Sequence, residues 1–144
     1  MKLEQELEIV QISIYCDIIT MLIKEHKAIS LTKLIVFSYL TKKENLIKNC
    51  VLRASNTKGI INKYLSLLAG DLENLFASYE YILKAIHILI ENEVVELNGI
   101  FISRPDKLDD SNFVFEETRF ARKAIERAKT LSDKQFMREV LSNV

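Results

Sequence analysis

The chain has 144 residues, 49% of them hydrophobic, which suffices for one domain with a core or one domain with an extension. Its 20 cationic and 20 anionic side chains cancel, which argues against a protein that coats nucleic acid through net charge. Three glycines and one proline are too few for a loop-rich β-sandwich. Cys16 and Cys50 lie in apolar helical patterns and are expected to be small buried hydrophobes. With no signal-peptide pattern and no span-length apolar stretch, we expect a cytoplasmic protein.

The first part of the chain is predicted to form two helices. Residues 3–26 carry apolar side chains at three- and four-residue spacing, and these lie on more than one side of the expected helix. Such a helix needs cover from its own domain and a partner, or from a second copy of itself. Residues 9–15 also alternate, so a strand is an alternative there. Ser30 is a candidate N-cap for a second helix over residues 31–40, which is expected to end at residues 41–43.

Shorter elements are expected between residues 44 and 76. Residues 44–52 read as a short helix, and the polar run 53–58 reads as a turn. A further helix is predicted over residues 58–69, with Gly70 as the glycine that ends it. Residues 71–76 are expected to form a connector or a single helical turn.

Residues 76–104 carry the clearest pattern, an amphipathic helix that leads into a β-hairpin. Ser78 is a candidate N-cap, and the dipeptide Asn98-Gly99 predicts a tight turn between strands 94–97 and 100–103. A helix that feeds directly into a hairpin is the second half of a winged-helix domain. The apolar stripe of the helix consists of Ile82, Leu83, Ile86, Leu89 and Ile90.

After Pro105 the pattern changes to a loop and two helices. Residues 106–112 are expected to form the loop, and residues 113–115 a third strand or a docking segment. Helices are predicted over residues 116–128 and after a capping box at residues 132–135. The predicted fold is therefore mainly α with a small β-hairpin: a winged-helix-like domain with an N-terminal helix over residues 1–104, and a C-terminal helical extension packed on it over residues 105–144.

The sequence contains no pattern typical of a catalytic or cofactor site. Three dispersed glycines cannot form a phosphate-binding loop, and no serine or cysteine lies in a nucleophile motif. His26 and His87 have no metal-ligand partner at suitable spacing. The acidic pairs at 109–110 and 116–117 are interpreted as solvated charge. We therefore expect neither an enzyme nor a bound cofactor or metal.

The charges are distributed unevenly along the chain. Residues 33–63 hold seven cations against one acid, whereas residues 71–96 hold six acids against one cation. On the expected recognition helix the solvent side presents Glu80, Lys84, His87 and Glu91, and its carboxylates would repel phosphates, so this helix is not expected to read DNA. Lysines in the basic segment are either a solvated face or candidate phosphate contacts. These candidates are Lys42, Lys43, Lys48, Arg53 and Lys58.

A recognition helix that avoids DNA is a candidate for protein contact. Tyr79, Tyr81 and Ile88 fall on or near its outward side, beside Lys84, and exposed aromatic residues are typical interface anchors. We take these four residues as candidate partner-binding residues, although burial in the core would explain each apolar one equally well.

Two runs of the sequence support a family resemblance. KAISLTKLIVFSYLTKK, followed by YEYILKAIHILIENEVVELNGIFI, resembles the small middle components of bacterial three-component ABC-type ATPase systems, which overlap with Lamassu-type anti-phage defence. The resemblance covers residues 12–102. The matching positions are Leu31, Leu34, Ile35, Phe37, Tyr39 and Leu40 in the second helix, and Glu93, Val94 and Val95 before the hairpin.

The resemblance implies a non-catalytic accessory subunit. Such a subunit binds a coiled-coil, SMC-like ABC ATPase and joins it to an effector, often a nuclease. Its role would resemble that of the winged-helix accessory proteins of SMC complexes, which tend to act as dimers, so a homodimer is one expectation; DNA would be contacted indirectly or weakly, with no membrane involved. Two alternatives remain open: a winged-helix transcription regulator that uses residues 42–63 on DNA, and a small inhibitory phage or plasmid protein.

Overall fold

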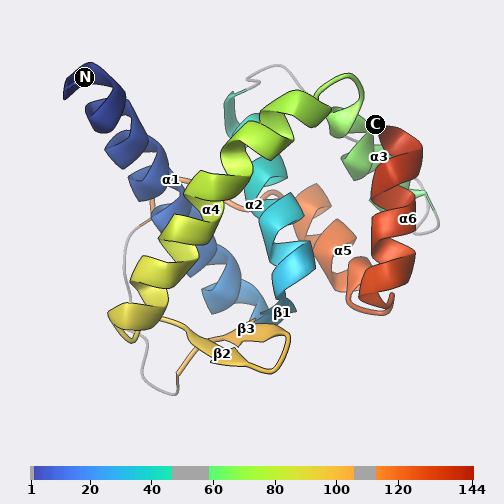
Figure 1. Cartoon of the computed structure of the whole chain (residues 1–144). Helices are drawn as coiled ribbons and strands as arrows, with labels where there is room; N and C mark the ends of the chain where they lie inside the picture. The colour runs from blue at the N-terminus through green and yellow to red at the C-terminus, as the bar shows by residue number, and fades with distance from the viewer. Residues whose placement is uncertain (1, 47–58, 106–112) are drawn as a thin grey trace.

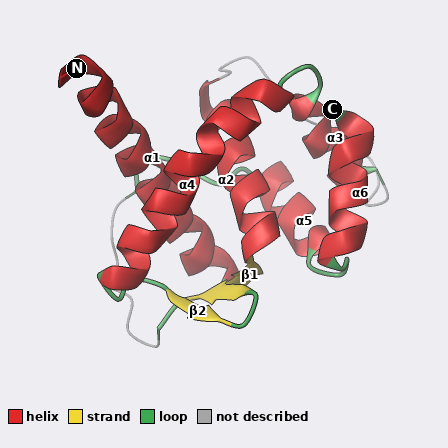
Figure 2. Ribbon diagram, in the orientation of Figure 1, coloured by secondary structure: helices red, strands yellow, loops and turns green. Residues whose placement is uncertain are grey.

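The structure is a computed structural model that describes residues 2–46, 59–105 and 113–144. Within these ranges the chain is mainly helical with one small antiparallel sheet, as predicted (Figure 1, Figure 2). The strand order β1-β3-β2 and the succession of elements are those of a winged-helix-like domain. The elements are α1 (Lys2–His26), β1 (Ala28–Ser30), α2 (Leu31–Leu46), α3 (Ile60–Leu65), the 3-10 helix η1 (Ser66–Leu68), α4 (Leu72–Glu91), β2 (Glu96–Asn98), β3 (Phe101–Ser103), α5 (Arg119–Ala128) and α6 (Asp133–Asn143).

The first two helices form where the apolar spacing predicts them. Helix α1 is continuous, so the alternation over residues 9–15 does not produce a strand. Helix α2 starts directly after Ser30, whose hydroxyl accepts a hydrogen bond from the Lys33 amide at 3.4 Å. The predicted end at residues 41–43 is wrong, because α2 continues to Leu46 through residues with good helix propensity. The remainder of the predicted helix 44–52 lies outside the described residues.

Helix α4 begins earlier than the sequence suggested. It starts at Leu72 after Asp71, so Ser78 is not its N-cap, and residues 72–76 are helical, as the second of the two alternatives for this segment predicted, but as part of α4. The reason is that Leu75 is buried and extends the apolar stripe by two turns. Gly70 ends the preceding helical segment as predicted, since its φ of +72° is a backbone conformation that favours glycine.

The sheet contains a strand that the sequence did not indicate, and a turn shifted by one residue. Strand β1 pairs with β3, with Ile29 opposite Ile102. Because Asn98 pairs with Phe101, the two turn residues are Gly99 and Ile100. Only Gly99 has a positive φ, of +61°, which fits a type II′ turn and not the type I′ turn expected for Asn-Gly.

The register of the hairpin follows from the burial of one side chain. Ile102 is buried with Ile29 and Val95 in the core. A slip of one residue along β3 would turn Ile102 towards solvent, so the core selects the observed register over the local preference of the turn.

An aromatic cluster joins the C-terminal helices to the winged-helix-like part. Phe37 of α2 lies 6.0 Å from Tyr64 of α3 and 5.2 Å from Phe136 of α6, measured between ring centroids. Phe120 of α5 makes an edge contact with Tyr64 at 5.9 Å. Helices α5 and α6 therefore share one core with α2 and α3, on the side away from the start of α1 (Figure 1). The domain division at residue 104 stays a prediction. None of the helices in the described ranges combines the length and apolarity needed to cross a bilayer.

We predict that Phe136→Ala lowers the free energy of unfolding by about 3–5 kcal/mol, because it leaves a cavity beside Phe37 in the shared core. Denaturant unfolding followed by circular dichroism measures this change. Leu141→Ala on the exposed side of the same helix is the control and should change stability by less than about 0.5 kcal/mol. Equal effects of the two substitutions would show that α6 is not part of the core.

Candidate partner-binding surface

The outer face of α4 is exposed, as its periodicity predicted. Glu80, Lys84, His87 and Glu91 all point to solvent, whereas Ile82, Ala85, Ile86 and Leu89 are buried. Large apolar side chains are exposed as well, above all Phe76 with 65% of its surface accessible. The face thus combines carboxylates with uncovered apolar groups.

The single lysine on this face is neutralised by its neighbours. The Lys84 ammonium donates a hydrogen bond to Glu8 of α1 and lies 3.0 Å from the Glu80 carboxylate. These contacts, with Glu8 first, raise the pKa of Lys84. Lys84 therefore holds α1 against α4 and adds no uncompensated positive charge, so the face is unsuited to phosphate.

The four candidate partner-binding residues do not form one patch. Tyr79 and Ile88 are both exposed but lie at opposite edges of the α4 face, since nine residues correspond to about half a turn beyond two full turns. Tyr79 lines a cleft with Phe76 beside α2 and α6, and Ile88 lines a shallow apolar groove beside α1. Tyr81 is half-buried between α1, α2 and α4. Phe76, which the sequence reasoning missed, is the partner of Tyr79.

The described lysines of the basic segment are engaged within the fold. The Lys43 ammonium lies 2.7 Å from the Asp71 carboxylate and 2.5 Å from the Leu67 carbonyl oxygen. Lys42 donates to Gln11 and lies 5.2 Å from the ring centroid of Tyr15, and its burial lowers the pKa of its amine. These two lysines connect α2 to its neighbours. Lys48, Arg53 and Lys58 lie outside the described residues, so their role in phosphate contact stays a prediction.

The Asp71 carboxylate accepts hydrogen bonds from three side chains that surround it. Burial acts to raise the pKa of its carboxyl, but hydrogen bonds from Lys43, Tyr39 and Asn74 outweigh that effect and lower the pKa overall. Burial, followed by the hydrogen bond to Asp71, raises the pKa of the Tyr39 phenol. Asp71, expected to lie in a connector or a single helical turn, thus fixes the start of α4 on α2.

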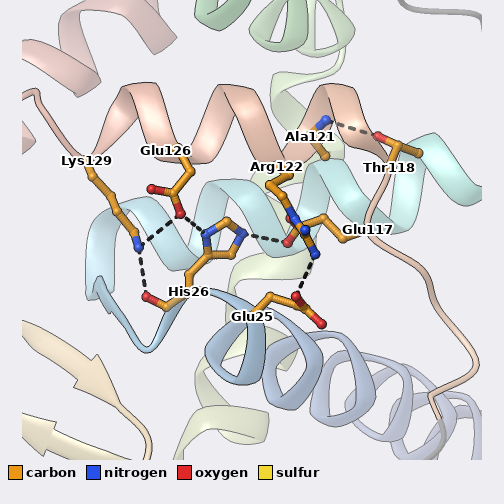
Figure 3. Close-up of polar contacts among 8 residues, drawn as sticks. All are labelled: Glu25, His26, Glu117, Thr118, Ala121, Arg122, Glu126 and Lys129. Atoms are coloured by element: carbon orange, nitrogen blue, oxygen red, sulfur yellow. Dashed lines mark hydrogen bonds and ion pairs between the residues drawn. The ribbon is translucent and has the colours of Figure 1, made fainter.

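A buried histidine lies between two carboxylates at the end of α1 (Figure 3). His26 Nε2 is 2.6 Å from Glu117 Oε2, and Nδ1 is 2.8 Å from Glu126 Oε1. The side chains of His26 and Glu117 are only 1% and 2% exposed. A neutral imidazole has one donor nitrogen, so both contacts are satisfied only when both ring nitrogens carry hydrogen or one carboxyl is protonated. We call His26, Glu117 and Glu126 the histidine clasp.

Three further residues position the histidine clasp. Thr118 caps α5, accepting a hydrogen bond from the Ala121 amide at 3.0 Å, and so places Glu117 just before the helix. Arg122 contacts Glu117 at 3.2 Å, and Lys129 donates to the His26 carbonyl oxygen at 2.8 Å (Figure 3). The clasp therefore fastens α5 to the C-terminal end of α1.

The sequence reasoning missed the histidine clasp. Its prediction that the acidic pair at 116–117 is solvated is wrong for Glu117, which is buried and paired. The partners of His26 lie 91 and 100 residues away along the chain, so no local spacing connects them. The one local signal was Thr118 before a helical pattern. Among the residues that the structure describes, no group of three or more His, Cys, Asp and Glu side chains could hold a metal ion.

Comparison of the chain with protein-family models, curated proteins and solved structures finds no match. The function is therefore proposed below from the chemistry of the surfaces described above, together with the resemblance of the sequence.

We predict that His26→Ala lowers the free energy of unfolding by roughly 2–4 kcal/mol, because it leaves the buried Glu117 carboxylate without one of its partners. His87→Ala removes the exposed histidine of α4 and is the matched control, with an expected change below about 0.5 kcal/mol. Thermal or urea unfolding measures both. A His26 variant as stable as the control would mean that the clasp contributes nothing to the fold.

The histidine clasp also predicts a specific pH dependence. The hydrogen bond from His26, with help from Lys129, lowers the pKa of Glu126 below its value in the unfolded chain. The folded state therefore binds fewer protons, so this contribution to stability is complete above about pH 5 and is lost as the pH falls through the lower folded value. Glu126→Gln should weaken the loss of stability below about pH 5 in unfolding curves measured from pH 7 to pH 3. Glu91→Gln, which removes an exposed carboxyl on α4, should show the same pH profile as the wild type. Identical profiles for all three proteins would contradict the contribution of Glu126 to the pH dependence.

Proposed function

We propose that the protein is a non-catalytic accessory subunit that connects an SMC-like ABC ATPase to its effector in a cytoplasmic complex of anti-phage or anti-plasmid defence. The observation that carries this proposal is the outer face of α4. In a winged-helix-like fold this helix is the one available for DNA, yet here it offers carboxylates, apolar groups and a lysine that is already paired. Such a surface suits another polypeptide better than a duplex.

The exposed aromatic residues of α4 supply the anchors for that contact. Phe76 and Tyr79 share a cleft with Thr32, Ile35 and Met137, so a partner side chain can enter between α4, α2 and α6. Large aromatic groups with an apolar cleft beside them are typical centres of binding energy in protein interfaces. The proposal of an ABC-type ATPase as the partner rests on the resemblance of the sequence to middle components of such systems.

The alternative, a winged-helix regulator that binds DNA, receives less support. It depends on the basic segment, but Lys42 and Lys43 are held by Gln11, Tyr15 and Asp71 within the fold. To contact phosphate, Lys43 would have to give up an ion pair and a backbone hydrogen bond. The net charge of zero adds no general attraction to nucleic acid.

We predict that the full chain, tagged and expressed from its native operon, co-purifies with a long coiled-coil protein that hydrolyses ATP. Phe76→Ser combined with Tyr79→Ser should reduce the recovered ATPase at least about tenfold, because both apolar anchors are removed. Leu141→Ser, an exposed apolar position on α6, is the control and should leave recovery unchanged. Mass spectrometry and ATP hydrolysis identify the partner.

Two results would overturn the proposal. One is a chain that purifies as a lone monomer under all salt conditions tested. The other is salt-sensitive binding of the isolated chain to a promoter fragment that Phe76→Ser with Tyr79→Ser leaves intact, which would favour the DNA-binding regulator.

A further inference from the structure

The first half of α1 carries an apolar stripe that the described part of the protein leaves open. Leu3, Leu7, Val10 and Ile14 follow each other at spacings of four, three and four residues, which is the heptad spacing of a coiled-coil seam. Leu3, Leu7 and Val10 are 67%, 55% and 51% exposed. In Figure 1 this end of α1 projects beyond α4. Ile14 is half-buried and packs against the core, so the open part of the stripe consists of Leu3, Leu7 and Val10, which we call the α1 seam.

The same stripe is covered further along α1 by the chain itself. The Asp17 carboxylate accepts a hydrogen bond from the Phe115 amide at 3.2 Å, so residues 113–115 cross the helix at this point. Met21, one heptad after Ile14, is buried and lines a cleft with Phe113 and Phe115. The later part of the α1 stripe is thus packed by residues 113–115, whereas the earlier part has no such packing among the described residues. The α1 seam is the continuation without a cover among the described residues.

The contacts behind the α1 seam fix its orientation. Glu8 pairs with Lys84 of α4, and Gln11 accepts from Lys42 of α2. Glu8 lies on the side of α1 away from the seam, and Gln11 lies at one of the positions that flank it. A partner would therefore meet a helix that is already folded and oriented, which lowers the entropic cost of association.

The charges beside the seam distinguish between two occupants. The positions that flank a heptad seam are Glu4 and Gln11 on one side and Glu6 and Ser13 on the other. A second copy would bring the same acidic and neutral groups and could form no ion pair across the seam. A helix with lysine or arginine at its flanking positions would pair with Glu4 and Glu6.

We propose that the α1 seam docks an amphipathic helix of another protein, whose own apolar seam is flanked by basic residues. This inference rests on the proposed function, since it names the chemistry of a partner that an interaction subunit would bind. It concerns a surface separate from the Phe76 and Tyr79 cleft of α4, so the two can be tested independently.

The test uses the full chain and two synthetic helical peptides of about four heptads, with leucine at the seam and either lysine or glutamate at all flanking positions. By isothermal titration at low salt, the lysine peptide should bind about tenfold more tightly than the glutamate peptide, because attraction at Glu4 and Glu6 is replaced by repulsion. Leu7→Gln with Val10→Gln should abolish binding of the lysine peptide. Glu4→Lys with Glu6→Lys should reverse the preference between the peptides, and Leu141→Gln should change nothing.

Four outcomes would overturn the inference. The first two are equal binding of both peptides by the wild type and an unchanged preference in the charge-reversed variant. The third is a loss of stability in the isolated Leu7→Gln with Val10→Gln variant, which would show that the chain covers its own seam. The fourth is a wild-type dimer in light scattering that becomes monomeric in this variant. If the ATPase co-purifies and depends on Phe76 and Tyr79 while the peptides fail to bind, the inference is wrong and the proposed function stands. If the lysine peptide binds and no ATPase co-purifies, the proposed function is wrong and the seam still docks a basic helix.

Discussion

The packing of Phe37 against Tyr64 and Phe136 fixes where the last helix of the chain lies on the rest of the fold. This contact brings α6 onto α2 and α3, and the edge contact of Phe120 with Tyr64 brings α5 onto α3, so the buried apolar side chains of the last two helices face that side of the fold. The start of α1 and the outer face of α4 are left without cover from the described residues. The two surfaces that we assign to partners are therefore a direct result of where the C-terminal helices pack.

Polar contacts decide which charges are available to a partner. From the sequence alone, the lysines of the basic segment and Lys84 of α4 would all be available to contact a partner. In the structure Lys42, Lys43 and Lys84 each contact another helix or the residue next to one. The charges that remain beside the exposed apolar residues are mostly carboxylates, such as Glu4, Glu6 and Glu91. This distribution favours a basic polypeptide over nucleic acid as the partner.

The sequence was informative where structure depends on neighbouring residues. Apolar periodicity predicted α1, α2 and the buried side of α4, and Asn98-Gly99 predicted the hairpin. The errors arose where distant residues intervene: burial of Ile102 shifted the turn by one residue, Leu75 extended α4, and pairing with β3 created β1. For the candidate surfaces, periodicity identified Tyr79, Lys84 and Ile88 as outward-facing. It could not show which neighbouring helices lie beside Tyr79 and Ile88, or that His26 would meet Glu117 and Glu126.

The histidine clasp has a consequence for the order of events during biosynthesis. Glu126 follows His26 by 100 residues, so a ribosome that adds about 5–20 residues per second delivers it roughly 5–20 s later. During that interval the nascent α1 presents an imidazole without its acidic partners and an uncovered row of aliphatic side chains. A partner or chaperone that recognises this helix would have its best access before Glu117 and Glu126 are synthesised, and closure of the clasp would end that interval.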